Sequence, residues 1–313
     1  MPDNNIFKNL NSPQKEAVKT VNGPVLVLAG AGTGKTRVIT YRIANLISKG
    51  ILPKNILALT FTNKAAREMK ERIYDLIDNE QSYELFIGTF HSFCIRILRS
   101  EVAHLDLYPG FTIADDVDQK SILKQVIANI NLSDNLDINV YKSFIGKAKQ
   151  ELKSPDQYLK QANGSFESII SKVYVRYQEA LLAQNMLDFD DILSYTVNLL
   201  DNNSDILKKY QKKYKYLLVD EFQDTNFVQF RLIELLSKNH KNICVVGDDD
   251  QSIYGWRGAK VENILDFPVH FPNAKVIKLE QNYRSTNTIL DAANAFISGN
   301  IRRHSKKLWS KNG

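Results

Sequence analysis

The sequence predicts an α/β fold in which a mostly parallel sheet is flanked by helices, with an all-helical subdomain inserted into it. Three observations support this prediction. Apolar runs of strand length recur along the 313-residue chain, each followed by glycine or polar residues. A glycine-rich segment ending in Lys-Thr follows the first of these runs. Between about residues 107 and 187 the strand-like runs nearly vanish and helical stripes dominate.

The first apolar run, 25–28, suits a strand buried on both faces, and it leads into the glycine-rich segment 29–34. Glycines let backbone N–H groups wrap around a phosphate, and the helix that Lys35 and Thr36 open adds a positive N-terminus. In this P-loop prediction, Lys35 contacts the β- and γ-phosphates and the Thr36 hydroxyl ligates magnesium. Ala29 stands where the strict motif has its first glycine, and the alternative is a plain glycine-rich turn.

The other elements follow in order from the same patterns. The helical stripe after the P-loop ends at Gly50, a suitable residue just beyond a helix C-terminus, and Thr62 or Asn63 can cap the next helix. We expect helices at 36–49, 63–77, 121–130, 141–152 and 168–186, and strands at 25–28, 56–61, 85–87, 216–219, 243–246 and 275–279.

Polar residues follow the later strands, where the carboxyl ends of parallel strands border a ligand crevice. Asp220 and Glu221 are adjacent at such an end, so their side chains leave in different directions. One carboxylate can hold magnesium while the other accepts a proton from, or orients, an attacking water. Gln251 and Arg284 carry groups suited to sensing or neutralising a γ-phosphate, although either can be a structural loop residue.

Aromatic residues also recur near strand ends, at Phe61, Phe90, Tyr254 and Trp256. Such residues are usually packed in a core or at its rim. The ring of Trp256, however, lies in a glycine-bracketed loop at 254–258 that offers little to pack against, which favours base stacking. For Phe61 the two interpretations stay equally open.

The composition allows ordinary cores and permits a nucleic-acid partner. Apolar residues make up 43% of the chain and charged residues 24%, and 41 Lys and Arg against 35 Asp and Glu give a formal charge of +6. A group of lysines in the insertion is either a solvated face or, less favoured, a track for DNA: Lys142, Lys147, Lys149 and Lys153.

Cysteine usage and hydropathy indicate the compartment. Cys94 and Cys244 are too few for a disulfide framework, and the five histidines form no metal-ligand spacing with them. No apolar run approaches the length of a membrane span, and the N-terminus does not resemble a signal peptide. We therefore expect a soluble cytoplasmic protein with no membrane partner.

Several segments together resemble the successive motifs of superfamily 1 DNA helicases of the UvrD/PcrA/Rep type. The resemblance covers nearly the whole chain and is weakest in the helical insertion. It rests on AGAGTGKTR, LALTFTNKAAREMKERI, GTFHSFC, DFDD, VDEFQDTN, VVGDDDQSIYGWRGA and LEQNYRSTNTIL.

The resemblance implies a RecA-like P-loop NTPase domain that uses ATP and Mg²⁺, and it implies a role for each matching residue. The implied nucleotide-binding residues are Gln14, Ala29, Gly30, Ala31, Gly32, Thr33, Gly34, Lys35, Thr36, Arg37, Tyr283 and Arg284, with Gln14 and Tyr283 at the adenine. Thr36 and Asp220 would hold magnesium, and the implied catalytic residues are Lys35, Glu221 as base, Gln251 as γ-phosphate sensor and Arg284 as arginine finger. The implied DNA-binding residues are Phe61, Thr89, His91, Tyr254, Trp256 and Arg257.

The same resemblance implies a division into domains. Residues 1–106 and 188–278 would form the first motor domain, 107–187 the helical insertion, and 279–313 the start of a second motor domain that continues beyond this chain. The implied function is ATP-dependent translocation on single-stranded DNA and unwinding at single/double-strand junctions, in repair or replication, by a monomer. The alternatives are the motor segment of a helicase-nuclease, or an ATP-responsive DNA-binding module without turnover.

Overall fold

A computed structural model of the chain describes residues 6–77, 84–130 and 136–312. The chain divides into two compact units. We call Met1–Phe90, Leu207–Asn226 and Ile233–Gly313 the sheet unit, and His91–Ile206 and Phe227–Leu232 the helical unit. Residues 107 and 187, the predicted ends of the helical insertion, both lie within the helical unit. That the insertion begins and ends at these residues stays a prediction.

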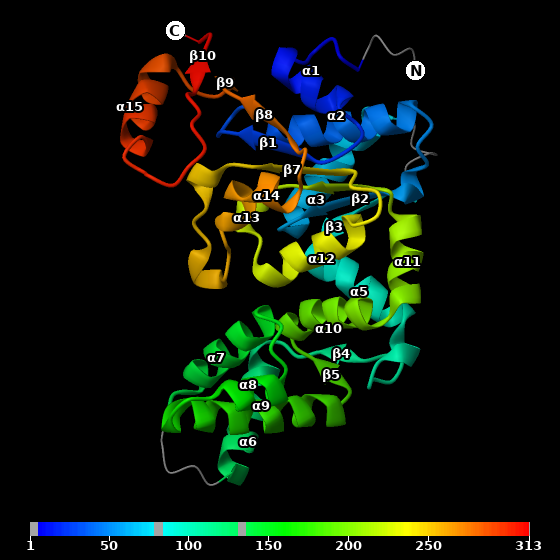
Figure 1. Cartoon of the computed structure of the whole chain (residues 1–313), viewed down its shortest axis with the longest axis vertical. Coiled ribbons are helices and arrows are strands. Elements are labelled where there is room, and N and C mark those ends of the chain that lie inside the picture. The colour runs from blue at the N-terminus through cyan, green and yellow to red at the C-terminus, as the bar shows by residue number, and fades with distance from the viewer. Residues whose placement is uncertain (1–5, 78–83, 131–135, 313) are drawn as a thin grey trace. The chain divides into compact units, whose positions relative to one another are not determined.

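A six-stranded parallel sheet forms the centre of the sheet unit, with the strand order β3-β2-β6-β7-β1-β8 (Figure 1). The predicted α/β class with a parallel sheet is confirmed. All residues of β1, β2 and β7 are buried, as expected for apolar strands covered on both faces. The strands are β1 Val25–Ala29, β2 Ile56–Thr60, β3 Phe86–Thr89, β6 Tyr216–Val219, β7 Ile243–Gly247 and β8 Lys275–Leu279.

The register of this sheet brings the predicted site segments to one edge. Leu28 pairs with Gly247, so the glycine-rich loop after β1 begins beside the end of β7. Leu59 pairs with Val219, so β2 and β6 also end together. Because every strand runs in the same direction, all six carboxyl ends lie at this edge.

Helices cover the sheet through a continuous apolar core, and α1 packs along α2 (Figure 1). The buried Arg42 of α2 fixes this pairing, because its guanidinium donates to the carbonyls of Ala17 and Val21. Outside residues 105–203, the described helices are α1 Ser12–Lys19, α2 Lys35–Ser48, α3 Asn63–Tyr74, α5 Phe90–Ser100, α11 Ser204–Lys213, α12 Phe227–Ser237, α13 Glu262–Leu265, α14 Phe267–His270 and α15 Asn287–Ile297, with short 3₁₀ turns at Pro53–Asn55, Val102–His104, Phe222–Asp224, Asp249–Gln251 and Gly255–Arg257. Of these, α5 from His91 onward and the first half of α12 belong to the helical unit.

The helical unit has its own core between α6, α7 and α9. The helical stripes between about residues 107 and 187 predict mostly helices, and the structure has mostly helices there. Two short parallel strands, β4 and β5, accompany them. The elements are β4 Thr112–Ile113, α6 Asp116–Ile130, α7 Ile138–Gln150, α8 Pro155–Gln161, α9 Ser165–Ala183, β5 Met186–Leu187 and α10 Phe189–Asn202.

The solvated-face interpretation is wrong for one of the insertion lysines. Lys149 is only 1% exposed, and its Nζ lies 2.7 Å from Asp188 Oδ2 and 2.8 Å from Asp191 Oδ1. The Tyr177 hydroxyl also donates to Asp188 Oδ2. The lysine is therefore the central cation of a buried cluster with Asp188, the N-cap residue of the helix that begins at Phe189, and Asp191 in the first turn of that helix.

The C-terminal segment adds a second small sheet to the sheet unit. The strands β9 Gln281–Asn282 and β10 Trp309–Ser310 pair in parallel, and α15 packs on β10 (Figure 1). Within the described part of the chain, no helix is both long and apolar enough for a bilayer crossing.

Candidate nucleotide-binding site

The glycine-rich loop between β1 and α2 has the conformation that a phosphate cradle requires. Gly32 and Gly34 adopt φ of +69° and +95°, which side chains disfavour. A Cβ at Gly32 would stand 2.7 Å from Asn282 Nδ2 and 2.8 Å from Arg284 Cβ. Helix α2 begins at Lys35, and its N-cap residue, Gly34, has no side chain to occupy the first N–H groups. Those groups are available to an anion.

The ammonium group of Lys35 lies between the ends of β6 and β7. Its Nζ is 3.4 Å from Glu221 Oε2 and donates to Gln251 Oε1 at 3.3 Å. Gln251 in turn donates through Nε2 to Asp248 Oδ2. The structure thus gathers the predicted phosphate-binding lysine, base and sensor around one point.

The Asp220-Glu221 pair stands at the carboxyl end of β6, and its backbone separates the two carboxylates. Glu221 is in the left-handed region, with φ 48° and ψ 45°. This conformation costs a non-glycine residue about 1 to 3 kcal/mol and is found mostly at functional sites. Glu221 is partly exposed towards Lys35, whereas Asp220 is buried.

The charge state of Asp220 reflects that burial. Desolvation, aided by the neighbouring Glu221 carboxylate, raises the pKa of Asp220 to about 7. Among the described residues, Thr60 Oγ1 and Asp224 Oδ1 in this region are buried without a hydrogen-bond partner. Thr60 ends β2, directly beyond the Leu59 pairing with Val219. Oxygens without a partner beside a buried carboxyl group are atoms that a cation can bind, and a nearby cation would favour the ionised form of Asp220.

The residues implied at the adenine lie beside the loop, but their polar atoms already have partners. Gln14 is fully buried, donates to Thr33 O at 2.9 Å and accepts from the Asn11 backbone. Tyr283 donates its backbone N–H to Gly32 O, and its hydroxyl accepts from Asn11 Nδ2. These contacts place both residues next to the loop, although Gln14 must exchange bonds to contact a base.

The remaining implied nucleotide residues also sit on or beside the loop. Arg284 is exposed, with its Cβ against Gly32, and Arg37 is exposed in the first turn of α2. Ala29 is the buried last residue of β1, and Thr36 lies in the first turn of α2. Within the loop, the Gly30 carbonyl accepts a bond from the Thr33 hydroxyl, and the Ala31 carbonyl accepts one from Asn282 Nδ2.

The aromatic residues implied for DNA fall into distinct groups. Trp256 is 75% exposed, so it is not a core residue, and the Arg257 guanidinium lies 4.6 Å from its ring centroid. Tyr254 packs against the same ring. Phe61 is half-buried in an edge-to-face contact with Phe90, near Thr89 at the end of β3.

His91 belongs to the helical unit, where its ring meets that of Phe189 edge to face. Burial lowers the pKa of His91, so the ring favours its neutral form. Phe189 is half-exposed and was not singled out from the sequence, although it lies in the DFDD segment.

Two further residues, Gln223 and Asn282, link segments of the site, and neither was singled out from the sequence. Gln223 donates to Glu221 Oε2 at 3.0 Å and accepts from the Asp248 backbone, so it joins the ends of β6 and β7. Asn282 donates to Ala31 O at 2.6 Å and accepts from the backbones of Arg284 and Ser285. Both lie inside motif segments, which was the only signal the sequence held for them.

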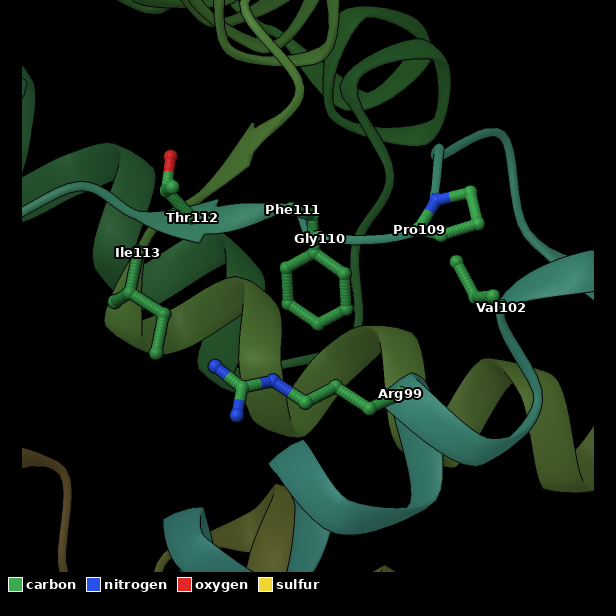
Figure 2. Close-up of a pocket in the computed structure, with 7 residues that line it drawn as sticks. All are labelled: Arg99, Val102, Pro109, Gly110, Phe111, Thr112 and Ile113. Atoms are coloured by element: carbon green, nitrogen blue, oxygen red, sulfur yellow. The ribbon is translucent and has the colours of Figure 1, made fainter.

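A cavity of about 560 Å³ in the helical unit contains none of the predicted site residues. Figure 2 shows its lining, in which Arg99 of α5 is the charged side chain. The lining residues are Arg99, Val102, Pro109, Gly110, Phe111, Thr112 and Ile113.

Comparison with known proteins agrees with this geometry. The family model of the UvrD/REP helicase N-terminal domain matches residues 10–272. Proteins named ATP-dependent DNA helicase PcrA from Staphylococcus epidermidis and Staphylococcus aureus are each 48% identical to this chain over 311 residues, which is 99% of the chain and 42% of the relative. The chain thus spans about two fifths of the length of these relatives. It belongs to the UvrD/REP helicase N-terminal domain family.

Proposed function

We propose that this chain carries the ATP-binding and catalytic residues of a DNA helicase. The helicase would couple ATP hydrolysis to translocation on single-stranded DNA and to duplex unwinding, in repair or replication. The observation that carries the proposal is Lys35 at the start of α2, with Glu221 Oε2 at 3.4 Å and Gln251 Oε1 at 3.3 Å. A lysine, a carboxylate and an amide lie together there beside the glycine loop. In phosphoryl transfer such groups can bind the phosphates, accept a proton from water and contact the γ-phosphate, respectively.

In this proposal the chain's own residues act as follows. The loop backbone and Lys35 bind the β- and γ-phosphates, and the lysine exchanges its contact with Glu221 for the phosphate oxygens. Glu221 is then released to take the proton of the attacking water. Gln251 keeps one Nε2 hydrogen for Asp248 and donates the other to a γ-phosphate oxygen, because its Oε1 is an acceptor like the phosphate oxygens. The exposed Arg284 neutralises charge that develops on the γ-phosphate.

The residues present also fit magnesium. The buried Asp220 carboxylate and the Thr36 hydroxyl would hold the ion. Thr60 Oγ1, at the end of the neighbouring strand β2, is a further oxygen close to Asp220, whose backbone N–H donates to Leu59 O. The ion, when bound, would neutralise phosphate charge.

For DNA, the exposed Trp256 and its neighbours support a single-strand surface. A base can stack on this ring without sequence preference, and Arg257 supplies positive charge beside it. Phe61, Thr89, His91 and Tyr254 are proposed as further contacts. We propose a cytoplasmic monomer that binds single strands and single/double-strand junctions.

Nucleotide titration tests the ATP site. A fluorescent ATP analogue should bind the wild-type chain with Mg²⁺, and Lys35→Ala should abolish tight binding because it removes the point charge held between Glu221 and Gln251 at the glycine loop. Lys54→Ala, at an exposed lysine before β2, is the matched control and should bind like wild type. Equal affinity in Lys35→Ala and wild type would remove the P-loop assignment.

Turnover separates a motor from a binding module. The resemblance implies another γ-phosphate arginine in a second motor domain, and such a residue can be worth about 10³ to 10⁵ in rate. We therefore expect these 313 residues to bind Mg-ATP, hydrolyse it poorly and leave duplex DNA intact. DNA-stimulated hydrolysis with strand separation, lost in Glu221→Gln, would show that this expectation is wrong.

A further inference from the structure

A buried lysine outside the predicted site contacts all three aspartates that follow β7. Lys306 is only 2% exposed, and its Nζ lies 2.8 Å from Asp248 Oδ1, 2.5 Å from Asp249 Oδ1 and 2.7 Å from Asp250 Oδ2. Arg303 adds a bidentate pair to Asp250 at 2.8 and 2.7 Å. The three aspartates are close enough to share a cation, and the lysine ammonium already occupies that position.

This cluster is electrostatically satisfied but not an efficient source of stability. Burial alone would lower the pKa of Lys306, yet the three carboxylates outweigh burial and raise it, so the lysine stays charged. Removing such charges from water costs about as much as their attraction returns, so a buried ion cluster is better explained by the arrangement it enforces.

The ion cluster around Lys306 is connected to Lys35 by a chain of bonds that runs through Asp248 and Gln251. The two oxygens of this carboxylate are divided: Oδ1 pairs with Lys306, and Oδ2 accepts from Gln251 Nε2. The other end of the Gln251 amide accepts from Lys35 at 3.3 Å. With both of its ends bonded, the amide has a defined orientation, with its oxygen towards Lys35.

We propose that Lys306 is a positioning residue for Gln251: by fixing Asp248 it holds the sensor amide at the γ-phosphate position. The segment that carries Lys306 thereby contributes to the distinction between a nucleoside triphosphate and a diphosphate. This inference rests on the proposed function, because it assigns Gln251 to the γ-phosphate.

Without Lys306, the buried Asp248 carboxylate loses its cation. It must take up a proton or turn towards another donor, and either change disturbs the bond to Gln251. The backbone N–H groups of the glycine loop, which would bind the β-phosphate, lie outside this chain of bonds, and Lys35 is present in the variant as in the wild type. Affinity for a diphosphate should therefore persist while the additional affinity for a triphosphate is lost.

The test compares ADP and ATPγS by displacement of a fluorescent ADP analogue from the 313-residue chain with Mg²⁺. In Lys306→Met the ratio of the two dissociation constants should fall by about tenfold, with ADP affinity within about twofold of wild type. Lys307→Met, at the exposed neighbouring lysine, is the matched control and should keep the wild-type ratio.

Charge imbalance can unfold the single variant, so a balanced variant accompanies it. Asp249→Asn with Lys306→Met removes one charge of each sign and still leaves Asp248 without its lysine, while Asp249→Asn alone leaves the Lys306 to Asp248 pair in place. The ratio should fall in the double variant and not in Asp249→Asn.

A lower melting temperature with an unchanged ratio would make Lys306 purely structural and overturn the inference. A wild-type chain that binds both nucleotides equally would overturn it as well. Failure of the wild type to bind either nucleotide would instead overturn the proposed function.

Discussion

The side chain of Leu308 lies against Gly30, so close that a Cβ built on that glycine would stand 2.5 Å from Leu308 Cδ2. The C-terminal segment therefore packs on the first glycine of the phosphate loop. Gly30 has no left-handed φ, in contrast to Gly32, so Leu308 is the main obstacle to a side chain there.

This contact predicts that a substitution at Leu308 can offset the loss of stability caused by a substitution at Gly30. Gly30→Ala should lower the free energy of unfolding by about 1 to 3 kcal/mol through overpacking. Leu308→Ala should restore most of the loss, since it removes the colliding atoms, and the double-mutant cycle should give a coupling of about 1 kcal/mol or more. Urea denaturation measures all four proteins. Additive effects in the cycle would contradict the contact, and Gly32→Ala should resist rescue because its φ of +69° disfavours any side chain.

Trp256→Ala should weaken binding of single-stranded DNA by about 1 to 3 kcal/mol, because the exposed ring is lost as a stacking platform. The melting temperature and the affinity for nucleotide should change little. Fluorescence anisotropy with a labelled oligonucleotide measures the effect. Phe296→Ala removes an even more exposed aromatic ring, on α15, and serves as the control. Equal DNA affinity in both variants would remove Trp256 from the DNA surface.

Lys149→Met should destabilise the helical unit by about 3 to 5 kcal/mol, because Asp188 and Asp191 would be left buried without their cation. Lys147→Met alters an exposed lysine of the same helix and should cost little. Urea denaturation followed by circular dichroism compares them. A loss no larger than that of Lys147→Met would show that the buried cluster contributes nothing to stability.

Asp190 gives a pH-dependent prediction. Burial, together with the Asp188 charge, raises the pKa of Asp190 to about 6. The folded state then holds this proton to a higher pH than the unfolded state, so the stability contributed by Asp190 falls as the pH rises from about 4 to about 6.

Asp190→Asn removes that loss, and its amide oxygen can still accept from Gln150. The variant should match wild type near pH 4 and exceed it at pH 7 by up to about 2 kcal/mol, a value reduced from the full conversion because Asp190 keeps some contact with solvent. Unfolding measured across this pH range provides the test. A variant less stable than wild type at pH 7 would mean that the ionised carboxylate is favourable.

The sequence predicted the sheet and the loop well because those features are local. Each buried strand is a short apolar run, and the residues after it lie at the carboxyl edge whatever the strand order. Lys35, Glu221 and Gln251 could therefore be expected near one another. Strand boundaries shifted by a residue or two, as at β3, which runs to Thr89.

Contacts between side chains distant in sequence could not be predicted in this way. Lys149 falls on a helical pattern like its neighbours, and only the packing of α7 against α10 determines that it is buried. The bond from Gln14 to Thr33 and the pairs made by Lys306 likewise depend on which elements become neighbours after folding. No periodicity encodes such pairs.

At Glu221 the residue that would be best for stability differs from the residue that the proposed ATP hydrolysis needs, because the backbone there is left-handed. Glycine or asparagine would adopt φ 48° with less strain, so replacing Glu221 with either should make the sheet unit harder to unfold. The same exchange would discard the proposed base. A screen for heat resistance alone would therefore enrich variants that have lost the proposed base, so directed evolution for thermostability needs a simultaneous selection for ATP hydrolysis by the whole helicase.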